Sequence, residues 1–93
     1  MIVHGYAKNH KYAGDGTLMI QVRIPSIHGP MSKYEYNGKT VRNYTDDIDL
    51  PWYQSVLMPH IPTEGEVVVL MSTNSKNTEF FVIGITGGSY YRG

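Results

Sequence analysis

The chain has 93 residues and a mass of 10.5 kDa, which is enough for one domain of ordinary size. Eight basic residues balance eight acidic ones, and only 17% of residues are charged, below the ~25% typical of globular proteins. Because nucleic-acid binding depends on a basic excess, this balance argues against a dedicated nucleic-acid binder. Cys is absent from the sequence, which excludes disulfides and thiolate metal sites. No apolar run approaches the ~20 residues of a membrane span and no signal-peptide pattern opens the chain, so we expect neither a membrane segment nor export.

Residue usage predicts an all-β protein. Val, Ile and Thr together number 23 residues, whereas Ala and Leu together number six. Branched side chains suit the pleated surface of a sheet, and helices prefer Ala and Leu. The ten Gly and five Pro residues are spread along the chain and leave few stretches long enough for a helix.

The first two strands are predicted near the N-terminus. Ile2–Ala7 is a short apolar opening, followed by a polar turn that contains Gly. Thr17–Ile24 then alternates apolar and polar residues, the pattern of a strand with one buried face. We expect Gln21 and Arg23 to lie on the other face of this strand. Pro25 ends it, because proline has no N–H for the sheet ladder.

A long polar and aromatic connection follows, over Met31–Leu50. Connections of this length in small domains are usually functional. Asn37 and Gly38 separate Tyr34–Tyr36 from Thr40–Arg42, and Asn-Gly favours a tight hairpin turn. The connection is therefore predicted to hold a hairpin, with an irregular loop as the alternative.

Three further strands are predicted after the connection, at Gln54–Met58, Glu66–Ser72 and Glu79–Ile85. The consecutive apolar residues Val67–Met71 indicate a central strand covered on both sides. The polar residues between the last two strands favour a hairpin.

Five strands in so short a chain suit a barrel better than an open sheet, because closure removes exposed edges. We expect a small five-stranded OB-fold-like Greek-key barrel, with the long connection between strands 2 and 3. The barrel is assigned to residues 1–88, and residues 89–93 form a short C-terminal tail.

Three stretches follow one another along the chain. They are Gly16–Gly29 with its Val-Arg-Ile, Asp49–Val56 with its Leu-Pro-Trp, and Pro62–Val69, which is followed by a strand ending in Val82–Gly84. Their order and spacing resemble the N-terminal OB-fold domain of the baseplate spike protein of contractile-tailed phages, the cell-puncturing protein of the central hub. The resemblance covers nearly the whole chain.

This resemblance implies a structural role in the virion. Three copies would surround the tail axis beneath a baseplate hub protein and connect the tail tube to a membrane-piercing spike, after assembly in the host cytoplasm. Known members continue into a lysozyme domain and a trimeric β-helix, whereas this chain stops at Gly93. We therefore expect a homotrimer that recruits the spike or lysozyme as separate chains and has no catalysis or cofactor of its own.

Metal sites are weighed at two places. Asp46, Asp47 and Asp49 form the only acidic cluster, but their spacing lacks the Asp-x-Asp-x-Asp-Gly pattern of a calcium loop. The four His residues have no metal-ligand spacing, and the His-x-His iron motif of the terminal spike has no match. A solvated turn and satisfied or exposed imidazoles are the preferred interpretations.

Catalytic sites are weighed at two other places. Ser26 and His28 lie close together in sequence, but no nucleophile elbow surrounds them. Glu64 and Glu66 are the pair to consider for glycoside hydrolysis, yet they flank a turn glycine and are expected to face solvent and cap a strand. We expect no catalysis.

Aromatic side chains are the strongest candidates for a partner surface, because aromatics and Arg are enriched at interface hot spots. The alternative is that Trp52 caps the barrel core and the other rings are scattered over the surface. The candidates fall in loops, strand starts and the tail, and are Tyr34, Tyr36, Tyr44, Trp52, Tyr53, Tyr90, Tyr91 and Arg92.

Two rival functions come from the fold. OB barrels often bind single-stranded nucleic acid by stacking bases on aromatics in a basic groove, and others bind oligosaccharides. The side chains that would line such a face are Tyr6, Tyr12, Lys8, Lys11 and Arg23. The balanced charge weighs against nucleic acid, and only the abundance of Trp and Tyr supports carbohydrate.

Overall fold

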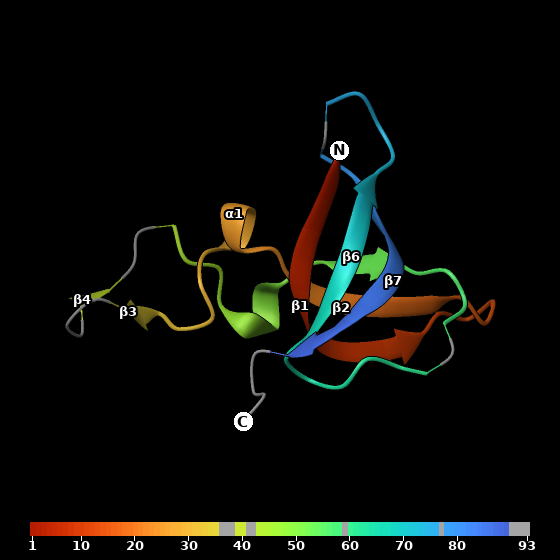
Figure 1. Ribbon diagram of the computed structural model, residues 1–93, viewed down its shortest axis with the longest axis horizontal. Helices are drawn as coiled ribbons and strands as arrows, with labels where there is room; N and C mark the ends of the chain where they lie inside the picture. The colour runs from red at the N-terminus through yellow and green to blue at the C-terminus, as the bar shows by residue number, and fades with distance from the viewer. Residues whose placement is uncertain (36–38, 41–42, 59, 77, 90–93) are drawn as a thin grey trace.

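A five-stranded antiparallel sheet and a separate two-stranded hairpin make up the fold (Figure 1). This computed structural model describes residues 1–35, 39–40, 43–58, 60–76 and 78–89. The sheet has the strand order β5-β2-β1-β6-β7, and the predicted all-β class is confirmed. The elements are β1 (Ile2–Tyr12), β2 (Leu18–Arg23), α1 (Pro25–His28), β3 (Tyr34–Glu35), β4 (Lys39–Thr40), η1 (Asp47–Asp49), β5 (Trp52–Gln54), β6 (Glu66–Ser72) and β7 (Phe80–Ser89).

The long β1 joins the two halves of the sheet. It was expected to end at Ala7 but continues to Tyr12, because a register shift between Ala7 and Asn9 lets one strand serve two neighbours. Its first half pairs with β6 and its second half pairs with β2. Gly5 of β1 lies close to the end of β2: a Cβ there would be 2.5 Å from Cγ1 of Val22 and 2.9 Å from the carbonyl oxygen of Arg23.

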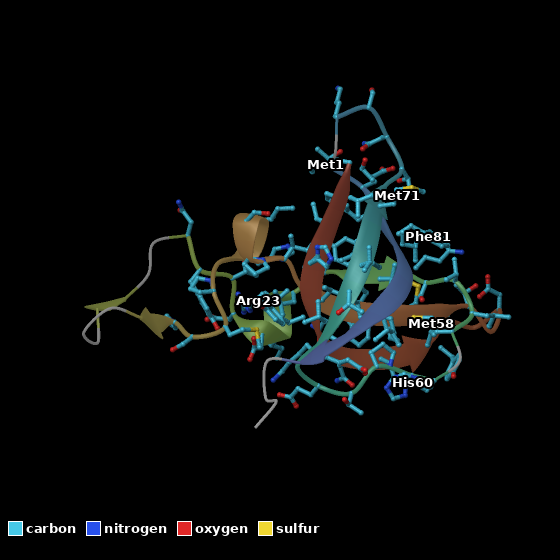
Figure 2. All side chains as sticks on the ribbon, in the orientation of Figure 1. Met1, Arg23, Met58, His60, Met71 and Phe81 are labelled. Carbon is cyan, nitrogen blue, oxygen red and sulfur yellow. The ribbon has the colours of Figure 1, made fainter. Side chains whose placement is uncertain are left out.

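The core lies on one face of the sheet. In β6, Val68 and Leu70 are fully buried, whereas Met71 is 43% exposed at the upper end of the strand (Figure 2). The prediction that β6 is covered on both sides is therefore wrong, although the strand does lie inside the sheet between β1 and β7. The buried core consists of Ala7, Leu18, Ile20, Val22, Ile24, Val68, Leu70, Phe80 and Val82.

The two edge strands, β5 and β7, approach each other across the core. Ser55 forms an isolated parallel bridge with Val82, and the Val56 N–H donates a hydrogen bond to the Val82 carbonyl at 3.1 Å. Tyr53 packs edge-on against Phe80, with ring centroids 6.2 Å apart. One bridge does not make a continuous ladder, so the sheet is not closed and the barrel stays a prediction.

The outer face of β2 is covered, contrary to expectation. Gln21 and Arg23 were placed on an exposed face, but they are only 6% and 1% exposed. Both side chains bond to backbone carbonyls of the returning connection, at Thr45, Asp47 and Leu50. The connection therefore lies over this face and excludes water from it.

The connection contains the hairpin that Asn-Gly predicts. Tyr34 pairs with Thr40 and Glu35 with Lys39, and the turn residues 36–38 lie outside the described residues.

Neither of the two short helices in the described part, α1 and η1, has the length and apolar character needed to cross a membrane.

Candidate functional site

Arg23 fastens the connection to the sheet from the end of β2 (Figure 2). Its Nη1 donates to the His28 carbonyl at 2.7 Å, and its Nη2 donates to Oδ1 of Asp47 at 2.9 Å and to the carbonyl of Thr45. The guanidinium carbon lies 4.3 Å from the ring centroid of Tyr44. A guanidinium has donors in a fixed fork, so one buried side chain ties the end of α1 to the last part of the connection.

The last residue of the one-turn helix α1, His28, bonds back through its side chain to the residue before the helix. Its imidazole is 6% exposed, and Nδ1 accepts the backbone N–H of Ile24 at 2.9 Å. Burial, together with the nearby positive charge of Arg23, lowers the pKa of His28. The neutral imidazole is therefore an internal hydrogen-bond acceptor, which is a structural role, and Ser26 beside it is exposed.

A chain of opposite charges continues from Arg23 across the surface. Lys8, in the bulge of β1, places Nζ 2.7 Å from Oε1 of Glu64 and 3.3 Å from Oδ2 of Asp47. The hydrogen bond to Glu64 is the main cause that raises the pKa of Lys8. Partial burial by itself would raise the pKa of Asp47, but hydrogen bonds from Arg23 and Lys8 outweigh it and lower that pKa.

These contacts occupy three of the five carboxylates that had been weighed as metal or catalytic candidates. Asp47 and Glu64 are paired with cations, and Oε1 of Glu66 accepts the N–H of Thr63 at 3.1 Å, closing the turn before β6. Across the described ranges, no group of three or more His, Asp or Glu residues is arranged to hold a metal ion.

A surface hollow of about 400 Å³ lies beside this charge network. Asn9, Gln21 and Trp52 are direct neighbours across β1, β2 and β5, and they form one wall. Nε2 of Gln21 donates to the carbonyls of Asp47 and Leu50 at 3.1 and 3.0 Å, which fixes η1 as the opposite wall. The residues that line the hollow are Lys8, Asn9, Gln21, Asp47, Ile48 and Trp52.

Two side chains stand out at the hollow and beside it. Ile48, on η1, is 87% exposed. Lys11 lies two residues after Asn9 on β1, and its Nζ is 4.2 Å from the ring centroid of Trp52. An exposed aliphatic side chain, a half-buried indole and a cation are thus grouped on one surface.

The predicted partner aromatics do not gather at one place. Tyr44 packs on Arg23 and Tyr53 on Phe80, so both contribute to internal packing. Tyr34 lies in the β3–β4 hairpin, and Trp52 lines the hollow. Their role in a partner interface stays a prediction. Outside the described residues lie Tyr36, Tyr90, Tyr91 and Arg92.

The residues suggested for a nucleic-acid face lie on the neighbouring strands β1 and β2, but two of their three cations already form ion pairs. Tyr6 and Arg23 are direct neighbours on β1 and β2. Arg23, however, is buried, and Lys8 is held between two carboxylates. Of the proposed cations, Lys11 alone has no carboxylate partner among the residues that the structure describes.

Sequence reasoning missed most of the hollow. Lys8 and Asn9 were assigned to a turn, Gln21 to a solvent face, and Ile48 to a loop. Lys8, Asp47 and Trp52 had each been singled out for other roles, but no sequence signal grouped them, because the hollow depends on where the connection returns to the sheet.

Models of known protein families, curated proteins and solved structures were compared with this chain, and none of them matches it.

Proposed function

We propose that this chain is a non-catalytic structural adaptor of a contractile phage-tail baseplate, joining the tail tube or hub to the membrane-piercing spike. The proposal places it in the virion as a homotrimer, with a hub protein and a spike or lysozyme chain as partners. It builds on the resemblance of the three sequence stretches and on the geometry of the long connection.

The β3–β4 hairpin is the observation that carries the proposal. Its strands are two residues each, and it lies apart from the five-stranded sheet, at the left in Figure 1. A two-stranded hairpin is marginally stable alone in water. The Arg23 contacts hold the base of this connection firmly. A small hairpin on a fixed base suits packing against a neighbouring subunit.

The strand arrangement supports the OB-fold-like part of the proposal. An OB barrel is a five-stranded, partly open Greek-key barrel. Here β1 pairs with both β2 and β6, and the long connection follows β2. The bridge between Ser55 and Val82 joins the two edge strands, where the barrel would close.

The engaged cations weigh against the rival nucleic-acid function. Binding to a phosphate backbone needs accessible positive charges, and Arg23 and Lys8 already neutralise internal partners. Fold analogy by itself cannot choose between these functions, so the experiment includes both.

The mass of the purified chain in solution, measured by light scattering after size exclusion with and without labelled oligo-dT, tests the proposal. We expect a particle of three times the 10.5 kDa chain mass that does not change when oligo-dT is added. A monomer that binds oligo-dT at physiological salt would overturn the adaptor function in favour of the nucleic-acid one. A monomer that ignores oligo-dT would restrict threefold order to the assembled hub.

A further inference from the structure

We propose that His28 is a pH-sensitive switch: when its imidazole gains a second proton, residues 43–47 of the connection shift toward a state separated from α1 and β2, while the five-stranded sheet stays folded. The switch lies within a single chain, so it goes beyond the proposed adaptor function and does not depend on it. Three observations carry it: the hydrogen bond that the ring accepts, the bonds that meet at the His28 carbonyl, and the charges around the ring.

The first observation is that the ring of His28 is the acceptor in a reciprocal contact with Ile24. Nδ1 accepts the Ile24 N–H at 2.9 Å, and the His28 N–H donates to the Ile24 carbonyl at 2.8 Å. Because Nδ1 is an acceptor, the single proton of the neutral ring is on Nε2. A second proton goes to Nδ1 and directs a donor at the Ile24 N–H. Protonation therefore removes this contact.

The second observation is that the His28 carbonyl joins α1, β2 and the connection. It accepts Nη1 of Arg23 at 2.7 Å and the N–H of Thr45 at 2.9 Å. The next residue, Gly29, has a φ of +90°, and a Cβ there would lie 3.3 Å from Cδ2 of Tyr44. The backbone after α1 thus packs directly against the connection. When the ring leaves its place at the start of α1, the carbonyl that holds Thr45 moves with it.

The third observation is that the ring faces a cation and, among the residues that the structure describes, no free carboxylate. Burial, followed by the positive charge of Arg23 on β2, lowers the pKa of His28. On the η1 side, Asp47 lies 2.9 Å from Arg23 and 3.3 Å from Lys8, so two cations already share its charge.

The other elements around the ring add no compensating charge. α1 has no acidic residue in its single turn. In the connection, Asp46 lies 3.7 Å from Nζ of Lys33, and Tyr44 stacks on Arg23 as a neutral phenol. A second positive charge beside Arg23 is therefore repelled, and the repulsion is relieved when the two parts separate.

The separation is expected to be local. Residues 43–47 cover the outer face of β2, whereas the buried core, with Val68 and Leu70, lies on the inner face. Removing the cover lets water reach Gln21 and Arg23 and leaves the core in place. Segments held by few buried contacts open at a lower free energy than the whole chain.

Hydrogen exchange of the ¹⁵N-labelled chain tests the switch through the Thr45 amide, which donates to the His28 carbonyl. The Thr73 amide is the matched control, because it donates to the Glu79 carbonyl at 2.8 Å in the β6–β7 turn. We expect the protection factor of Thr45 to fall about tenfold between about pH 7.5 and pH 5, and that of Thr73 to change less than about twofold. The decline begins near 6.5, the ordinary pKa of histidine, and levels off where the His28 ring signal titrates.

Urea and two variants separate a local switch from unfolding of the whole chain. Below the unfolding transition, exchange of Thr45 is expected to be nearly independent of urea, whereas exchange of Leu70, inside β6, accelerates with urea. His28→Asn keeps an acceptor and cannot titrate, so its Thr45 protection should not change with pH. His4→Asn, at an exposed position on β1, should retain the change of the unmodified chain.

Three results would each overturn the switch. They are a Thr45 protection factor that stays constant across this pH range, a decline that persists in His28→Asn, and a Thr45 amide that follows the urea dependence of Leu70 at acidic pH. The first and the third are measured on the unmodified chain, so the test does not depend on whether the variant folds.

Discussion

Arg23 and Asp47 stand 24 positions apart in the chain, yet Nη2 of the arginine lies 2.9 Å from Oδ1 of the aspartate. The arginine side chain is 2% exposed and the aspartate side chain 47%, so the pair runs from the interior to the surface. This contact sets where the long connection returns to the sheet. One wall of the hollow, the base of the hairpin and the burial of β2 all depend on it.

Replacing the buried arginine should therefore be costly. Arg23→Met is expected to lower the free energy of unfolding by about 3 kcal/mol, because it removes the guanidinium hydrogen bonds to the carbonyls of His28 and Thr45 and to Oδ1 of Asp47. Urea unfolding measures the loss. The matched control is Lys33→Met, since Lys33 forms an exposed 3.7 Å pair with Asp46 and should change stability by less than ~0.5 kcal/mol. Similar losses in both variants would contradict the anchoring role of Arg23.

The close contact between Gly5 of β1 and the end of β2 predicts a strong requirement for glycine at this position. Gly5→Ala would place a methyl group 2.5 Å from the Val22 side chain and 2.9 Å from a carbonyl oxygen, so the strands must separate. We expect this substitution to lower the free energy of unfolding, measured by thermal denaturation, by about 2 kcal/mol. Gly14→Ala, in an open turn with no atom within 4 Å of the added carbon, serves as the control. An unchanged melting temperature for Gly5→Ala would show that β1 and β2 are further apart than described.

Hydrogen exchange can test whether the edge strands meet. The Val56 N–H donates to the Val82 carbonyl at 3.1 Å, and we expect this amide to exchange slowly, close to the global opening rate. The next residue, Leu57, is 94% exposed, and its amide is expected to exchange quickly. If both amides exchanged at the same fast rate, β5 and β7 would not be joined in solution.

The buried imidazole predicts a loss of stability at mildly acidic pH. Burial and the neighbouring Arg23 hold the pKa of His28 below its ordinary value of 6.5. As the pH falls through 6.5, the unfolded chain binds a proton that the folded chain refuses, so stability is full above this pH and declines below it. Urea unfolding between about pH 8 and pH 5 measures the decline.

Two variants assign this pH dependence. His28→Asn keeps an acceptor for the Ile24 N–H and cannot titrate, so the slope between about pH 7 and pH 5 should flatten. His4→Asn, at an exposed position on β1, should leave the slope as it is. A slope that persists in His28→Asn would assign the effect to another group.

Local patterns were sufficient for β2, β6 and the β3–β4 hairpin, but not for two other strands of the sheet. The third strand was predicted at Gln54–Met58 but β5 is Trp52–Gln54, and the last strand was predicted to end at Ile85 but β7 continues to Ser89. Period-two apolar residues placed β2 within one residue at each end, Glu66–Ser72 coincides with β6, and Asn-Gly predicted the β3–β4 hairpin. These signals involve residues that are neighbours in the chain, and strand and turn preferences act at that range. The length of β1 was missed because its bulge is imposed by two different neighbours.

The sequence by itself determined that the protein is all-β, where β2 and β6 lie and which segment is the long connection. Only the tertiary structure decided that Gln21 and Arg23 are buried, that His28 is an internal acceptor, and that Lys8, Ile48 and Trp52 share a hollow. Alternation along a strand reports which residues share a face, but it does not report what covers that face. Here the cover is a segment more than 20 residues further along the chain, held by hydrogen bonds to backbone carbonyls, and every residue type offers a carbonyl.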